Sequence, residues 1–121
     1  MARILVIDDS TTEIFRFHEI LSKHGFDVIE AFSGADGVTM AKIEQPDLIL
    51  MDVVMPGVNG FQATREISRH DSTKHIPVII VSTKDQETDR EWGKRQGAKE
   101  YLTKPVAEDR LIQVIEQYIG Q

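Results

Sequence analysis

The feature that most constrains the fold is a regular alternation of short β-branched runs with longer segments of helical spacing. The runs ILVI, LILM and VIIV contain no polar residues, so they predict strands that are covered on both faces of a sheet. Strands that alternate with helices form βα units and a parallel sheet. The strands are expected at Ile4–Ile7, Asp27–Glu30, Leu48–Met51, Val78–Val81 and Glu100–Leu102, and the helices at Thr12–His24, Ala35–Glu44, Gly60–His70, Gln86–Gln96 and Glu108–Ile119.

Five βα units predict an α/β fold with a doubly wound, five-stranded parallel sheet and five helices. The flavodoxin-like strand order 2-1-3-4-5 is the expected arrangement, and it places the first and third strands side by side. A chain of 121 residues has room for a single domain. Ligands of such sheets bind beyond the carboxyl ends of the strands, so the residues that follow each strand are the candidates for function.

Composition excludes several classes of protein. The net charge is −6, whereas a protein that binds nucleic acid through its general surface needs positive charge. The chain has no cysteine, which excludes disulfides and thiol chemistry. Its apolar runs are far shorter than the roughly 20 residues that span a bilayer, and its first residues do not resemble a signal peptide. We therefore expect a cytoplasmic protein without membrane insertion or direct nucleic-acid binding.

Acidic residues follow two strands that the predicted order makes neighbours. Asp8 and Asp9 come after the first strand, and Asp52 comes after the third. Neighbouring strands lie about 4.8 Å apart, so these carboxylates must approach one another, which is costly without a cation. A cluster of oxygen ligands suits Mg²⁺, whose coordination is often completed by a phosphate. The cluster therefore predicts a magnesium site.

Hydroxyl and ammonium groups follow the other two strands at the same edge. Ser82 and Thr83 come after the fourth strand, and Lys104 comes after the fifth. Taken singly, each of these residues is most simply a strand-end or loop residue. Their coincidence with the acidic cluster instead indicates a crevice for a phosphoryl group on or near a carboxylate.

The motifs ILVIDDS, DLILMDVVMPGVNGFQATREI, IPVIIVST and GAKEYLTKPV together resemble the response-regulator receiver domains of two-component signalling, and the resemblance covers the whole chain. The stretches MPGVNGFQATR and STKDQETDREWGKRQGAKEYLTKPV are similar to a receiver of twitching motility. The resemblance implies a phosphoacceptor that switches protein–protein contacts, in type IV pilus or chemotaxis-like signalling. Its partner would be a CheA-like histidine kinase. Residues 1–121 are expected to form one receiver domain with no output domain.

The resemblance also implies a role for each acidic residue. Asp52 would accept the phosphoryl group from the phosphohistidine of the kinase. Asp9 and Asp52 would bind Mg²⁺ together with the backbone carbonyl of Val54, and Asp8 would contribute through a water molecule. Such a domain catalyses only its own phosphorylation and dephosphorylation, so no further enzyme activity is expected.

The remaining implied roles concern the hydroxyl, the ammonium and an aromatic ring. Ser82 would donate to one phosphoryl oxygen, and Lys104 would pair with another. Tyr101 matches the family's aromatic switch residue, which turns inward when the hydroxyl at Ser82 moves. The bond from Lys104 to Pro105 is cis in the family.

Three positions beside the site vary widely in such domains and bear on the lifetime of the phosphoryl group. They are Val54, Thr83 and Lys84, whose side chains are expected to border the path of the hydrolytic water. Thr83 replaces the alanine or glycine that is often found after the hydroxyl. A wider path would be left by either of those smaller residues.

Several alternative functions follow from the same residues. The protein could act on a downstream partner, or it could serve as a phosphate sink for a shared kinase. A Mg²⁺-dependent phosphatase of a related fold needs a second acid two residues after its nucleophile, and here that residue is Val54. A flavin or nucleotide binder is disfavoured because the chain lacks G-x-G-x-x-G and P-loop motifs.

Two expectations concern aromatic residues outside the site. The fourth expected helix has Trp92 as its only large apolar residue, so either Trp92 anchors this helix to the sheet or the helix packs weakly. The phenylalanines are expected to pack in the core or against helices; they are Phe15, Phe17, Phe26, Phe32 and Phe61.

Overall fold

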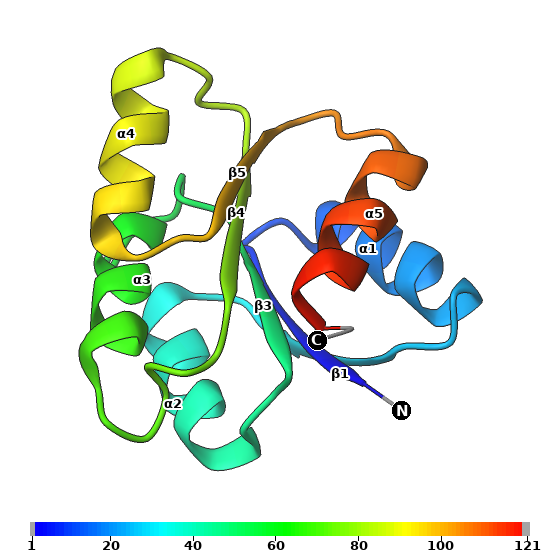
Figure 1. The fold of residues 1–121 in the computed structure, drawn as a ribbon, viewed down its shortest axis with the longest axis horizontal. Coiled ribbons are helices and arrows are strands. Elements are labelled where there is room, and N and C mark those ends of the chain that lie inside the picture. Colours follow the sequence, from blue (N-terminus) through cyan, green and yellow to red (C-terminus); the bar gives the residue numbers. More distant parts are fainter. Residues whose placement is uncertain (1, 120–121) are drawn as a thin grey trace.

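Five parallel strands form one sheet in the order β2-β1-β3-β4-β5 in a computed structural model that describes residues 2–119. Helices α2, α3 and α4 cover one face of this sheet, and α1 and α5 cover the other (Figure 1). The predicted fold class and strand order are therefore confirmed. The strands are β1 (Arg3–Ile7), β2 (Asp27–Ala31), β3 (Leu48–Met51), β4 (Val78–Ser82) and β5 (Glu100–Thr103), and the helices are α1 (Thr11–Lys23), α2 (Gly34–Glu44), α3 (Gly60–Arg69), α4 (Glu87–Gln96) and α5 (Glu108–Ile119).

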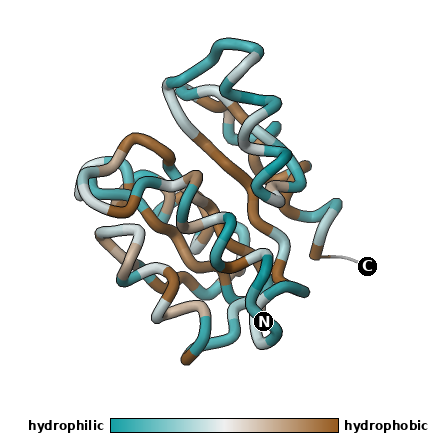
Figure 2. The backbone as a smooth tube through the Cα atoms, turned by 90° about the vertical axis from the view of Figure 1, so that its left-hand side faces the viewer, coloured by the Kyte–Doolittle hydropathy of each residue, from teal (hydrophilic) through white to brown (hydrophobic). Residues whose placement is uncertain are grey.

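Successive residues of the strands point to opposite faces and form two separate apolar clusters. Leu5 and Ile7 of β1 pack with α2 and α3, whereas Ile4 and Val6 pack with α1 and α5. Figure 2 shows the hydrophobic residues concentrated in the central strands and hydrophilic residues along the helices. Because both faces are covered, the central strands read as continuous apolar runs, as the sequence predicted.

The register of the sheet sets the level at which each strand ends. Ile7 of β1 is paired with Met51 of β3, so Asp8 and Asp52 follow neighbouring strands at the same level. The Asp52 N–H continues this ladder by donating to the carbonyl of Ile7 at 3.0 Å. The register therefore brings the two carboxylates to one edge of the sheet.

The packing of helix α4 on the sheet excludes one of the two alternatives, namely that Trp92 anchors the helix. The Trp92 side chain is 48 % exposed, and the buried residues of the helix are Gly93 and Gln96. Gly93 lies so close to Ile80 and Tyr101 that a β-carbon there would stand 2.8 Å from Ile80 Cδ1. Close backbone approach at a glycine, rather than a large apolar side chain, therefore seats this helix.

The expectation for the phenylalanines is wrong at two positions. Phe17 is buried, but Phe15 is 65 % exposed and Phe32 is 47 % exposed. The buried stripe of α1 consists of Ile14, Phe17 and Leu21, which recur at helical spacing on one face. Phe15 is one residue, about 100°, away from Ile14 around the helix, so it faces outward.

Candidate functional site

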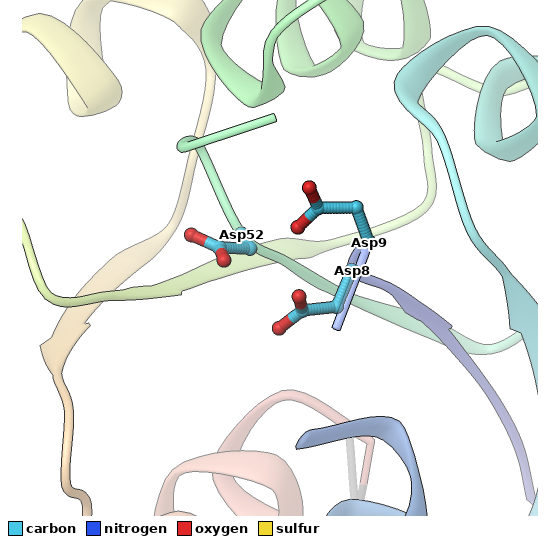
Figure 3. Close-up of side chains that lie close together, drawn as sticks. All are labelled: Asp8, Asp9 and Asp52. Atoms are coloured by element: carbon cyan, nitrogen blue, oxygen red, sulfur yellow. The ribbon is translucent and has the colours of Figure 1, made fainter. Parts of the chain in front are cut away.

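The three aspartates predicted to form a cluster lie together beyond the ends of β1 and β3 (Figure 3). One carboxylate oxygen from each of Asp8, Asp9 and Asp52 lies within 4.8 Å of the others. Asp8 is only 2 % exposed, Asp52 is half-buried, and Asp9 is exposed on the rim. The structure thus brings together all three acidic residues that the sequence singled out.

Main-chain N–H groups two residues downstream orient two of these carboxylates. The N–H of Ser10 donates to Asp8 Oδ1 at 2.9 Å, and the N–H of Val54 donates to Asp52 Oδ1 at 3.1 Å. An aspartate side chain is short enough to accept a hydrogen bond from the main chain two residues further on, so aspartate readily forms this local turn. In both residues the second oxygen, Oδ2, is left to face the centre of the site.

Lys104 occupies that centre and contacts both of those oxygens. Its Nζ atom lies 2.8 Å from Asp8 Oδ2, 3.4 Å from Asp52 Oδ2 and 3.3 Å from Glu13 Oε1. Its side chain is 10 % exposed. Glu13, on the first turn of α1, is a residue that sequence reasoning missed. The sequence offered only the spacing of Ser10 and Glu13, which marks the start of a helix and gives no sign of the contact with Lys104; in the structure the Ser10 hydroxyl accepts from the Glu13 N–H at 3.3 Å.

Burial and pairing act on the ionisation of both members of the central ion pair. Burial raises the pKa of the Asp8 carboxyl, and the hydrogen bonds from Lys104 and the Ser10 N–H offset this only in part. Burial alone would lower the pKa of Lys104. The hydrogen bond to Asp8 and the charges of Asp52 and Glu13 outweigh that effect, so the pKa of Lys104 is raised and the group stays an ammonium.

Ser82 and Tyr101 lie on the α4 side of the site. Ser82 is fully buried, and its hydroxyl accepts a 3.3 Å hydrogen bond from the N–H of Lys84. The Tyr101 ring is 4 % exposed, so it already lies inward. Its hydroxyl donates to the carbonyl of Lys84 at 2.6 Å. Burial, followed by the charge of Asp89, raises the pKa of Tyr101 to about 12.

Arg90 of α4 holds this aromatic residue from outside and was also missed by sequence reasoning. Its guanidinium donates to the carbonyl of Tyr101 at 3.2 Å and to the hydroxyl of Thr103 at 2.5 Å. It also lies over the Tyr101 ring, 5.5 Å from the centroid, within the range of a cation–π contact. No residue pattern revealed this, because a helical arginine is ordinarily solvated.

Two openings lead to the site. One is bordered by Asp9, Val54, Asn59, Phe61 and Lys84 among others, and the other by Glu13, Arg16, Thr83, Lys104 and Pro105. The Val54 side chain is 51 % exposed, and Thr83 and Lys84 are also exposed. All three residues expected to flank the path of water therefore lie at the openings.

Two backbone features frame the site. The peptide bond between Lys104 and Pro105 is cis, as the resemblance implied. Gly60, the first residue of α3, donates its N–H to the carbonyl of Val53 at 3.3 Å. A β-carbon at Gly60 would collide with the carbonyl oxygen of Asp52, so only glycine lets α3 begin here.

The fold and the acidic edge define a class of signalling protein, and the comparisons agree. Residues 4–116 match the response regulator receiver domain, and the chain belongs to that family. It is 59 % identical over 120 residues to Protein PilH of Pseudomonas aeruginosa, with 99 % of each chain covered. These matches confirm the resemblance to receiver domains that the sequence motifs indicated.

Solved structures agree with this assignment. The receiver domain of a Pseudomonas aeruginosa PAO1 sensor histidine kinase, solved with magnesium coordinated in its active-site cleft, matches with a TM-score of 0.92 and 28 % identity over 99 % of this chain and 98 % of that chain. The chemotaxis protein CheY4 of Vibrio cholerae matches with a TM-score of 0.91 and 26 % identity over 98 % of each chain. Among residues 2–119, no helix has the length and apolar character needed to cross a membrane.

Proposed function

We propose that this receiver is a phosphoacceptor response regulator in which Asp52 takes a phosphoryl group from the phosphohistidine of a CheA-like kinase. The observation that carries the proposal is the meeting of three carboxylates within 4.8 Å with a nearly buried ammonium at their centre. Few uses other than phosphoryl chemistry call for this combination of charges at the carboxyl edge of a parallel sheet. Phosphorylation would then switch contacts with other proteins.

Differences among the three carboxylates favour Asp52 as the acceptor. Asp8 is almost sealed from solvent, and both of its oxygens are held at 2.9 Å or less. Asp9 is exposed on the rim of the site. The Asp52 side chain is 11 % exposed and precedes Val53 and Val54, which line one opening, and its Oδ2 has only a 3.4 Å contact with Lys104. This oxygen is the most available nucleophile.

In the proposed transfer, an Asp52 oxygen forms a bond to phosphorus while the bond from phosphorus to the histidine nitrogen breaks. The nitrogen keeps the electron pair. Negative charge on the phosphoryl oxygens would be opposed by Lys104 and by the hydroxyl of Ser82. Positioning and charge stabilisation of this kind supply most of the catalysis in phosphoryl transfer.

The donor set fits Mg²⁺. The acidic cluster offers only carboxylate oxygens, which are the ligands that this hard cation prefers, and one lysine cannot neutralise three aspartates. Asp9 and Asp52, with the Val54 carbonyl, would hold the ion, and Asp8 would act through a water molecule. When bound, the ion supplies positive charge beside the transferring group. The magnesium in the related kinase receiver supports this reading.

The pathway is proposed from the relative rather than from the site. The similarity to Protein PilH supports a role in type IV pilus and twitching or chemotaxis-like signalling in the cytoplasm. Within that role the protein acts on a downstream partner or drains phosphate from a shared kinase. Phosphotransfer profiling against the histidine kinases of the source organism, with and without competing receivers, separates these two roles.

The test of phosphoacceptance is labelling with acetyl phosphate and Mg²⁺, followed by intact-mass analysis. One phosphoryl group is expected on the wild type and none on Asp52→Asn. The matched control is Asp71→Asn, the same change at a carboxylate whose side chain is 95 % exposed. Undiminished labelling of the Asp52 variant would refute the assignment.

A further inference from the structure

Helix α1 contributes two side chains that hold Lys104. Glu13 places Oε1 at 3.3 Å from Lys104 Nζ, and the ring of Phe17 lies 6.0 Å from the same atom. Residues four apart lie on one face of a helix, so Glu13 and Phe17 approach Lys104 from the same side. The carboxylate contacts the ammonium while the buried ring packs nearby.

The same helix also holds the segment that follows Lys104. The Arg16 guanidinium donates to the carbonyl of Val106 at 3.0 Å, and Glu13, Arg16 and Lys104 border the same opening. Lys104 is therefore held from α1 both through its ammonium and through the main chain two residues later. None of these contacts involves β3 or Asp52, which follows it.

The ammonium of Lys104 has three N–H donors and three carboxylate neighbours, Asp8, Glu13 and Asp52. A phosphoryl group on Asp52 would bring new oxygens that compete for these donors. Asp8 is buried and stays at 2.8 Å, whereas the Glu13 side chain is 30 % exposed and can be solvated when released. Glu13 is therefore the partner that Lys104 can give up most easily.

We propose that Glu13 is a positioning residue that retains the Lys104 ammonium on the α1 side of the site and releases it when Asp52 is phosphorylated. This inference rests on the proposed function of Asp52. Glu13 thereby sets how readily Lys104 turns to the phosphoryl oxygens, without itself touching the reacting atoms. Its removal makes the ammonium available earlier and accelerates phosphoryl acceptance.

The first test compares initial rates of phosphorylation by acetyl phosphate in Glu13→Gln, Glu13→Asp and Glu19→Gln. Glu13→Asp keeps the charge but is one methylene shorter, so it loses its reach to Lys104. Glu19→Gln makes the same change of net charge at an exposed position of the same helix. Both Glu13 variants are expected to react about 3- to 10-fold faster, as loss of a partly exposed ion pair allows, and Glu19→Gln to match the wild type.

Glu13→Asp distinguishes a positioning role for Glu13 from simple electrostatic repulsion between its carboxylate and the anionic acetyl phosphate. A Glu13→Asp protein that reacts like the wild type, beside a fast Glu13→Gln protein, would show repulsion and overturn the proposal. Equal rates for all four proteins would overturn it as well. Circular dichroism and thermal melting establish that each variant is folded.

The second test follows the Lys104 ammonium directly by ¹⁵N NMR. Glu13→Gln should shift this resonance in the unphosphorylated protein, and the two proteins should converge when beryllofluoride occupies the site. A shift of equal size in both states would contradict release on phosphorylation. A wild-type protein that accepts no phosphoryl group would refute the proposed function. Separately, an unchanged Lys104 resonance in unphosphorylated Glu13→Gln would refute the contact between Glu13 and Lys104 on which this inference depends.

Discussion

The hydroxyl of Tyr101 donates a 2.6 Å hydrogen bond to the main-chain carbonyl of Lys84. This bond joins β5 to the loop between β4 and α4, next to the buried hydroxyl of Ser82. Arg90 covers the outer face of the same ring. The inward position of Tyr101 is thus stabilised by α4 and its preceding loop, and any rotation of the ring must first break these contacts.

Tyr101→Phe is expected to lower the free energy of unfolding by about 1 kcal/mol, because the Lys84 carbonyl loses its donor. Urea denaturation at neutral pH measures this loss. Tyr118→Phe is the control, since that hydroxyl contacts Glu100 at 2.8 Å near the surface and lies away from the β4–α4 loop. A neutral effect of Tyr101→Phe would show that the bond is not maintained in solution.

The ionisation of Tyr101 predicts a loss of stability at alkaline pH. Burial, and then the charge of Asp89, raises its pKa from 10.0 to about 12 in the folded state. Above pH 10 the unfolded chain releases this proton while the folded protein retains it, so stability present below pH 10 is lost as pH rises towards 12. Wild type should lose stability more steeply than Tyr101→Phe in this window. Denaturation at several pH values measures this, and an equal dependence of stability on pH in the two proteins would contradict the raised pKa of Tyr101.

Asp9→Asn is expected to lose Mg²⁺ binding while keeping or gaining stability without metal. Asp9 is exposed and shares a small space with Asp8 and Asp52, so neutralising it relieves repulsion. Mg²⁺ at about 100 times its Kd should stabilise the wild type by about 2.7 kcal/mol and the variant by little. Thermal melts in EDTA and in Mg²⁺ measure both effects, with Asp85→Asn as an exposed control. A marked loss of stability in EDTA would assign Asp9 a structural role.

Thr83→Ala is expected to shorten the lifetime of the phosphoryl group and to leave its acceptance nearly unchanged. Thr83 is exposed at the opening beside Lys104 and Pro105, where a smaller side chain leaves a wider path for water. Loss of label after removal of acetyl phosphate gives the rate of hydrolysis. Thr88→Ala, at an exposed position of α4, should behave like the wild type. Equal or slower hydrolysis in the Thr83 variant would count against shielding.

Gly93→Ala is expected to lower the free energy of unfolding more than Trp92→Ala, although Trp92 has the larger side chain. The new methyl at Gly93 would meet Ile80 Cδ1 at 2.8 Å and Tyr101 Cδ2 at 3.0 Å. Overpacking of this kind costs about 1–3 kcal/mol, which equals or exceeds the roughly 1 kcal/mol gained in helix propensity. Trp92 is 48 % exposed, so its loss should cost less. Chemical denaturation measures the stability of both variants. A larger loss of stability in Trp92→Ala would show that Trp92, and not Gly93, makes the decisive contact of α4.

The strand-end residues could be predicted from the sequence because a parallel sheet brings all carboxyl ends to one edge. The apolar runs located β1 and β3, and the strand order followed from five βα units, so Asp8 and Asp52 had to meet. Glu13 and Arg90 could not be predicted in the same way. Their contacts depend on how α1 and α4 are rotated against the sheet, and a charged helical residue looks the same in sequence whether it faces solvent or a partner.

The exposure of Trp92 and that of Phe15 have a related physical origin. Size and hydrophobicity suggested burial, but the rotation of each helix is set by all of its contacts together. In α4 the decisive contact is made by Gly93, which has no side chain to attract notice. In α1 the stripe that begins at Ile14 already fills the space beneath the helix, so Phe15 is left outside.

The close approach of Gly60 to the carbonyl of Asp52 has a consequence for protein engineering. The loop that begins at Asp52 is tied back at its far end by the N–H of Gly60, which donates to Val53. Residues 52–60 therefore form a closed unit that includes the proposed acceptor and the start of α3. A chimera that exchanges this loop between receivers should carry Gly60 with it, because a junction that leaves a larger residue there would displace the aspartate.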